Sequence, residues 1–230
     1  METPLTMVND QPKLGFLSRL VGLFTGPGRV FAWLSEKPDF IWPVIFLLIS
    51  LGFSLSVKDF LLQVMIETFP KYAETLAKAP SSLSAGMLAV SAFSMLLYLV
   101  TSAFFYWLLA KMAGGERIRF SAAMSIIGYI QIVNALQSVF LGGVFLATGT
   151  YPPLGLEANM ELSKRLFTTQ GQFLSQINPF TVYWLFLTWA ALKKGFKLTG
   201  GKATVITIIS WIVGLLLTVG MSAMQFQNLK

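Results

Sequence analysis

Long apolar segments alternate with shorter polar ones along this chain. A helix that crosses a membrane needs about 20 predominantly apolar residues. Five segments meet or approach this length: Phe40–Val57, Leu88–Leu109, Ala122–Ala147, Ile177–Leu192 and Ala203–Met224. Each is too continuously apolar for a strand of a transmembrane barrel, in which apolar and polar positions alternate. The pattern therefore predicts an all-α membrane protein built as a five-helix transmembrane bundle.

The residues before the first segment predict an amphipathic helix at the membrane surface. An apolar stripe runs through Leu14, Leu17, Leu20, Val21 and Phe24, with Lys13, Ser18 and Arg19 off that face. Such a helix lies in the headgroup layer, where basic side chains bind anionic lipid. We expect Lys13, Arg19 and Arg29 to be the headgroup-binding residues.

A break follows this helix at Gly26-Pro27-Gly28, because proline lacks an N–H and glycine tolerates a sharp turn. A second short helix over residues 29–35 would place Phe31 and Trp33 at the interface. Pro43 then stands near the start of the first span, where no helical N–H partner is required. We expect residues 1–39 to form a cytoplasmic arm, residues 40–224 the transmembrane domain, and residues 225–230 an extracytoplasmic tail.

Composition supports the membrane class and narrows the chemistry. Hydrophobic residues make up 55% of the 230 positions and charged residues 12%, about half the charged share of a soluble domain. The chain contains no cysteine and no histidine, which removes thiol chemistry and the usual general base. The net charge of +7 is typical of cytoplasmic loops that contact anionic headgroups, and we expect no nucleic-acid partner.

The distribution of Lys and Arg predicts the orientation. With the N-terminus inside, 11 basic residues are cytoplasmic, namely Lys13, Arg19, Arg29, Lys37, Lys111, Arg117, Arg119, Lys193, Lys194, Lys197 and Lys202. The other 6 are Lys58, Lys71, Lys78, Lys164, Arg165 and Lys230. Positive residues favour the cytoplasmic side, so the N-terminus is predicted inside and the C-terminus outside. Both long outer connections, residues 58–78 and 156–174, carry apolar stripes that predict amphipathic helices, either as lids or lying on the membrane.

Polar residues at helical spacing follow one face of the third segment. Ser125, Gly128, Gln131, Asn134 and Ser138 recur every three or four positions, and such a face should point into the bundle rather than at lipid. It could serve helix packing, with amides bonding across helices, or it could line a polar cavity for a ligand. Both interpretations stay open at this point.

No ionisable residue lies deep in any of the five segments. Proton-coupled transporters and intramembrane hydrolases usually need one at depth, and a serine nucleophile needs a base. We therefore expect no enzyme activity, no catalytic residue, no metal site and no cofactor.

Several short motifs, in order, resemble the Yip family of Ypt/Rab-interacting proteins, in its bacterial branch. The arm offers Gly26, Pro27, Phe31, Pro38 and Pro43; the third segment offers Gly128-Tyr129; and the fourth begins with Asn178-Pro179. The similarity extends from about Phe24 to Gly220.

The resemblance implies five spans, a cytoplasmic N-terminus and a role in membrane trafficking. Eukaryotic members contact Rab GTPases, but this chain lacks their long cytoplasmic N-terminal domain, so GTPase binding is not inferred. We expect a non-enzymatic protein of a bacterial inner (plasma) membrane that acts through protein or lipid contacts, with a membrane-protein partner or a second copy of itself. The alternative is a small-molecule transporter or channel component that uses the polar face of the third segment and the Asn178-Pro179 break.

Overall fold

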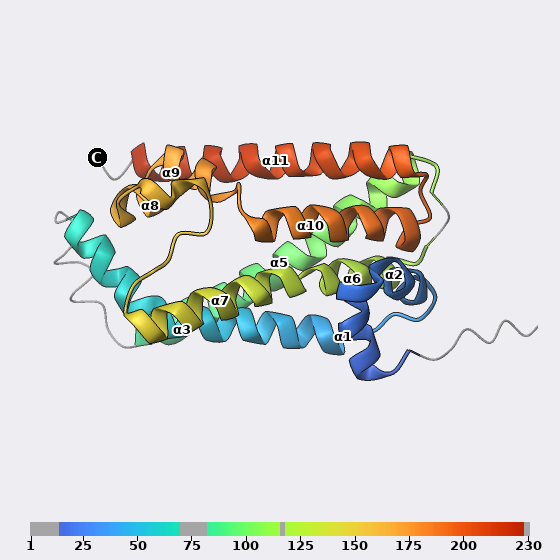
Figure 1. The fold of residues 1–230 in the computed structure, drawn as a ribbon, viewed down its shortest axis with the longest axis horizontal. Coiled ribbons are helices and arrows are strands. Elements are labelled where there is room, and N and C mark those ends of the chain that lie inside the picture. The colour runs from blue at the N-terminus through green and yellow to red at the C-terminus, as the bar shows by residue number, and fades with distance from the viewer. Residues whose placement is uncertain (1–13, 70–81, 116–117, 228–230) are drawn as a thin grey trace, which may run out of the picture.

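A computed structural model describes residues 14–69, 82–115 and 118–227, and every regular element within these ranges is helical. The long helices are α3 (Ile41–Thr68), α5 (Ser82–Met112), the pair α6 (Phe120–Ile130) and α7 (Ile132–Thr148), α10 (Pro179–Ala190) and α11 (Gly200–Gln227). Successive long helices run in opposite directions along the bundle (Figure 1). The prediction of an all-helical fold is confirmed.

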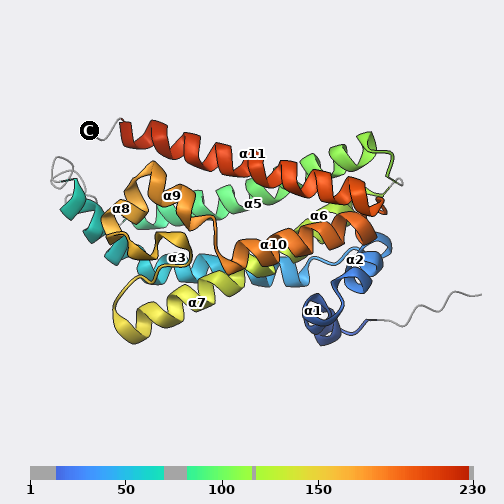
Figure 2. The ribbon, with the colours of Figure 1, turned by 45° about the horizontal axis from the view of Figure 1, so that its top comes forward.

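The short elements gather at the two ends of this bundle. Helices α1 (Phe16–Thr25) and α2 (Pro27–Glu36) lie at the end where α5 finishes and where α10 connects to α11 (Figures 1 and 2). The opposite end carries the 3₁₀ helix η2 (Leu156–Asn159), α8 (Leu162–Phe167) and α9 (Thr169–Ser175). Helices α1 and α2, in the described part of the arm, therefore share one end with the connections that follow α5 and α10.

Fewer helices than expected are long enough to cross a membrane alone. Three segments meet the length and hydropathy required: Ala89–Met112, Phe120–Thr148 and Gly200–Met221. A fourth is reached if α2 and the first part of α3, bent by 118° relative to each other, count as one span. Helix α10 has 12 residues and rises about 18 Å, whereas the hydrocarbon core is about 30 Å thick. A count of five spans is therefore not established by these helices.

The two outer connections also differ from their prediction. Residues 58–68, expected in a separate surface helix, continue α3 without a break, and residues 70–78 lie outside the described part of the chain. The segment 156–174 forms η2, α8 and α9 instead of one amphipathic helix. Thr168 ends α8 and caps α9, because its side chain accepts a hydrogen bond from the Gly171 N–H. Helix α9 packs against α11, so this connection folds onto the bundle.

Helix α2 was predicted close to its observed position but with the wrong environment. Pro27 occupies its first turn, where the missing N–H costs nothing. Val30, Phe31 and Leu34 are at most 1% exposed, and α2 packs on α6 and on the π-helical turn η3 (Ala191–Gly195). Phe31 is therefore a core residue and not an interfacial aromatic. Apolar spacing alone could not distinguish the two, since both settings favour phenylalanine.

Two motif residues explain how α3 and α6 approach each other. Pro43 lies in the first turn of α3 and is buried. A Cβ atom on Gly128 would stand 2.7 Å from both Cβ and Cγ of the Pro43 ring, closer than side chains pack. The absence of a side chain at position 128 therefore sets the separation of the two helices.

Replacing Gly128 with Ala should consequently destabilise the protein by about 1–3 kcal/mol, because the added methyl group overpacks this crossing. Gly143→Ala is the matched control, since nothing lies within 4 Å of a Cβ at that position. Helix propensity predicts a change between zero and about 1 kcal/mol of stabilisation there. Unfolding free energies in mixed micelles measure both. Equal stability of the two variants would contradict the close approach of α3 and α6.

Candidate functional site

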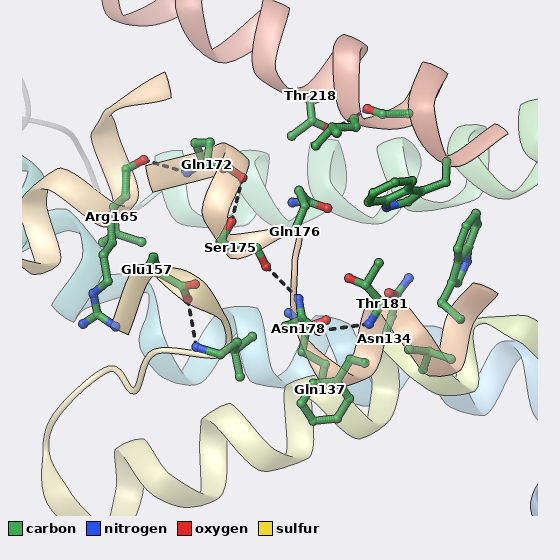
Figure 3. A pocket seen from close by; sticks show the side chains of 18 of the residues that line it. Asn134, Gln137, Glu157, Arg165, Gln172, Ser175, Gln176, Asn178, Thr181 and Thr218 are labelled. Atoms are coloured by element: carbon green, nitrogen blue, oxygen red, sulfur yellow. Dashed lines mark hydrogen bonds between the residues drawn. The ribbon is translucent and has the colours of Figure 1, made fainter. Parts of the chain in front are cut away.

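A polar cavity of about 610 Å³ opens between α7, α9, α10 and α11. It exists because α10 begins part-way along the bundle, at Asn178-Pro179. The space beyond the start of α10 is covered by the connection that contains η2, α8 and α9 (Figure 3). Thr218 and Met221, from the last part of the α11 span, line the same cavity. Irregular backbone at the level of a span is tolerated where it lines such a cavity.

Neutral hydrogen-bonding groups dominate one side of this cavity. The amide side chains are Asn134, Gln137, Gln172, Gln176 and Asn178, with hydroxyls from Ser175, Thr181 and Thr218. Figure 3 shows them converging from α7, α9, α10 and α11. Apolar and aromatic side chains complete the lining, among them Phe180, Trp184, Trp211 and Leu215. The site can therefore hold a small amphipathic molecule through neutral donors and acceptors.

Part of this polar lining is occupied in holding the backbone. Asn178 caps α10: its Oδ1 accepts from the Thr181 N–H at 2.9 Å, and its Nδ2 donates to the Ser175 carbonyl at 2.7 Å. Gln172 donates to the Leu166 carbonyl at 2.8 Å. Losing such a cap typically costs about 1 kcal/mol. Asn178, which the sequence marked as a motif residue, thus fixes where α10 starts.

The predicted polar face of the third segment is divided between two regions. Ser125, Gly128 and Gln131 are buried, whereas Asn134 is exposed to the cavity and Ser138 is half-buried. A one-residue turn at Gln131 separates α6 from α7. The Asn134 amide donates to Gln131 Oε1 at 2.5 Å, so this bond stays within the segment instead of crossing to another helix. Gln137, which the sequence analysis did not select, also lines the cavity, three residues after Asn134 on the same helix.

A second polar cluster, which we call the Asp39 clamp, joins the N-terminal arm to the bundle. Asp39 is 8% exposed. Its Oδ2 lies 2.7 Å from Arg19 Nη1 and accepts a hydrogen bond from the Tyr129 hydroxyl. The Ser125 hydroxyl accepts from the Asp39 N–H at 2.9 Å and donates to the Asp39 carbonyl at 2.7 Å. Helices α1 and α6 therefore meet at Asp39, which lies in the short linker between α2 and α3.

Aromatic contacts complete the attachment of α1. The Arg19 guanidinium lies 5.1 Å from the centre of the Trp33 ring, a distance at which cation–π attraction applies. The Trp42 indole donates to the Phe16 carbonyl at 2.9 Å, and the two rings stack at 4.4 Å. At the other end of α1, Phe24 stacks on Tyr183.

These contacts change which of the predicted residues are available to bind headgroups. The Arg19 side chain is 12% exposed and paired with Asp39, so its charge is held inside the protein. Arg29 is exposed and stays a proposed headgroup ligand. Lys13 lies outside the described residues. Sequence reasoning missed Asp39 because an acidic residue just before an apolar segment also reads as a solvated flank. The one feature of the sequence that could have indicated this role is the position of Asp39, directly before the apolar segment that contains Pro43.

Charged groups also reach the cavity, at the end formed by the connection before α10. Glu157 and Arg165 both line it. Burial raises the pKa of the Tyr151 hydroxyl above its usual value, while Arg165 lowers it and Glu157 raises it. Tyr151 is thus a neutral donor beside two opposite charges. Within the described ranges, no group of three or more His, Cys, Asp or Glu residues is placed to hold a metal ion.

Breaking the Asp39 clamp should be far more costly than breaking an exposed ion pair. Removing one partner of a buried pair leaves an uncompensated charge and typically costs about 3–5 kcal/mol. We expect Asp39→Asn to approach this range, and a double-mutant cycle with Arg19→Gln to give a coupling free energy above 1 kcal/mol, on the order of measured coupling in such networks.

The Glu161–Lys164 pair is the control, with side chains 73% and 61% exposed. Exposed helix pairs contribute only about 0.3–0.5 kcal/mol. Unfolding titrations of Glu161→Gln, Lys164→Gln and the double variant give its coupling free energy. If the coupling at the Asp39 clamp is no larger than this control, the clamp does not hold the arm.

Comparison with known proteins gives a family and no individual relative. No curated protein and no solved structure matches the chain. The family model described as the Yip1 domain matches residues 21–221, a range that contains Asp39, Ser125 and Tyr129 of the Asp39 clamp, but not Arg19, together with the α3–α6 crossing and the cavity. These matched residues show that the chain belongs to the Yip1 domain family.

Proposed function

We propose that this Yip-class membrane protein is non-enzymatic and acts through contacts with lipid at the surface of a bacterial inner membrane, where it contributes to membrane organisation. The observation that carries the proposal is the state of α1. One side of this helix is fixed to the bundle by the Asp39 clamp, while Leu17, Val21 and Phe24 are 67%, 57% and 52% exposed on the other. A rigidly held helix that presents large apolar side chains is suited to insertion between headgroups.

The surroundings of α1 favour lipid as the occupant of this face. At the same end of the bundle, Lys111 lies 4.2 Å from the Trp107 ring and Lys193 lies 4.7 Å from the Trp189 ring. Tryptophan with a neighbouring lysine is typical of the membrane–water interface, where the ring stays in the boundary and the ammonium reaches water. Exposed Arg29 adds a cation next to the apolar face. Each such cation near an anionic surface contributes about 1 kcal/mol.

Depth measurements on α1 test this docking. The chain has no cysteine, so a spin label at Val21→Cys reports on one position only. We expect this label to collide with oxygen more than with an aqueous nickel chelate in liposomes, because the α1 face enters the headgroup boundary. A label at Glu36→Cys, on the exposed side of α2, is the control and should favour the chelate. Equal exposure of both labels to water would refute the docking of α1.

The same end of the bundle is proposed to face the cytoplasm, with the C-terminus outside. Its described basic residues are Arg19, Arg29, Lys37, Lys111, Arg119, Lys193, Lys194, Lys197 and Lys202. Lys164 and Arg165 lie at the opposite end. This asymmetry is the pattern of the positive-inside rule.

Cysteine labelling in intact cells measures the orientation. With an impermeant maleimide, Glu161→Cys should react and Thr199→Cys should react only after the cells are permeabilised. Both positions are exposed turns or helix ends, so access does not differ for other reasons. The reverse labelling pattern would show that the arm faces outward.

The polar cavity favours a second candidate, a small-molecule transporter or channel component. Asn134, Asn178 and Gln137 reach one space at the level of the α11 span, and discontinuous helices are where transporters place their substrates. Uptake of a polar solute by proteoliposomes, lost on Asn134→Leu with the fold retained, would favour this candidate over the contact function. Contact with a membrane-protein partner or a second copy would use the exposed outer faces of α5 and α11.

A further inference from the structure

The carboxylate of Glu157 is buried without a complete set of partners. The residue is 4% exposed. Its Oε1 accepts from the Leu154 N–H at 2.8 Å, whereas Oε2 has no hydrogen-bond partner. A buried carboxylate oxygen that is left unpaired is costly, because it has lost its water partners without gaining others. Glu157 also lines the cavity, which places this carboxylate in the cavity wall.

The Arg165 side chain is also only partly paired, and it lines the same end of the cavity. Arg165 Nη2 donates to the Tyr151 carbonyl at 3.0 Å, and its buried Nε has no partner. Among the described residues neither Glu157 nor Arg165 forms an ion pair, although the neighbouring Glu161 and Lys164 pair on the surface at 3.2 Å. Figure 3 shows Glu157 and Arg165 together at one end of the cavity, away from Asn134 and Thr181.

Glu157 and Arg165 carry opposite charges, and each has one atom without a hydrogen-bond partner. Together they determine which charges a ligand needs. An anion alone would satisfy Arg165 and be repelled by Glu157, and a cation alone would do the reverse. A molecule that carries both an ammonium group and an anionic group neutralises both, and charge-assisted hydrogen bonds are the strong ones. A third unpartnered polar group, the buried Trp211 indole N–H, belongs to a residue that lines the cavity and suits an additional ligand oxygen.

We propose that the cavity binds a zwitterion, with its ammonium group at Glu157 Oε2 and its phosphate or carboxylate at Arg165 Nε. The source is either the headgroup of a zwitterionic phospholipid or a free zwitterionic solute. The neutral amides and the Trp184–Trp211 side hold the remainder of the molecule. This site is separate from the lipid docking of α1, shares no residue with it, and holds whether or not the ligand is transported.

Binding to the purified full-length protein in non-ionic detergent tests the charge requirement. The probes are glycerophosphoethanolamine, which carries both charges, glycerol 3-phosphate, which is only an anion, and ethanolamine, which is only a cation. Calorimetry should give the zwitterion an affinity about tenfold or more above either half, since each half leaves one charge unpaired. Equal affinities of the zwitterion and the better half would overturn the proposal, and this comparison needs no variant.

Variants then locate the site. Glu157→Gln keeps the Oε1 acceptor for Leu154 and should lower zwitterion affinity about tenfold or more while leaving glycerol 3-phosphate bound at least as well. Arg165→Gln should lower the affinity for both phosphates. The matched controls, Glu161→Gln and Lys164→Gln, change the same charges on the surface and should bind as the unmodified chain does. Equal losses in the controls and the site variants would contradict this location.

A second experiment distinguishes between the two sources of the ligand. Native mass spectrometry of the protein released from nanodiscs of phosphatidylethanolamine and phosphatidylglycerol reports retained lipid. Retention of phosphatidylethanolamine that is lost in Glu157→Gln but not in Glu161→Gln supports a lipid headgroup. Binding of glycerophosphoethanolamine without lipid retention supports a free zwitterion. If neither the free compound nor the lipid binds, the proposal is wrong, and the docking of α1 is unaffected.

Discussion

The Asp39 carboxylate is the constraint on which the architecture at the α1–α2 end of the bundle rests. It receives the Arg19 guanidinium and the Tyr129 hydroxyl, while the Asp39 backbone exchanges two hydrogen bonds with Ser125. A buried charge is tolerated only when it is paired and its remaining lone pairs are satisfied. Because Arg19 comes from α1 while Tyr129 and Ser125 both come from α6, the position of α1 follows from that of α6. The 118° bend between α2 and α3 places Asp39 where side chains of α1 and α6 both contact it.

At the opposite end of the bundle, the short length of α10 is the feature that determines the architecture. A helix that spanned the whole bundle would fill the space now taken by the cavity. Capping by Asn178 stops α10 short, and the connection before it must then enter the bundle to cover the gap. The same connection brings Glu157 and Arg165 to the cavity. One helix start therefore determines both the shape of the site and the charges available in it.

The sequence was sufficient for the helical class and for most helix positions, because apolar periodicity is a local property. It predicted α1 and α2 within about two residues and located Pro43, Gly128 and Asn178 at positions that prove to be structural junctions. It could not predict that Asp39 would find Tyr129, since that pairing joins residues 90 positions apart. The cavity was foreseen only as one of two uses of the Asn134 face, and Glu157 and Arg165 were assigned to a surface helix. Their burial depends on how the connection folds, which no local pattern encodes.

The separation of Asp39 from its partners also imposes an order on assembly. Ser125 follows Asp39 by 86 residues, which a ribosome adds in about 4 to 17 seconds at typical rates. During that interval α1 and α3 have left the ribosome, but the surface that fixes α1 has not been made. The first residues to emerge are thus among the last to reach their final contacts. Until the third segment is made, the partners that fix α1 through Asp39 do not exist, and the docking of α1 on the membrane surface proposed above is the contact that would keep the arm near its final position.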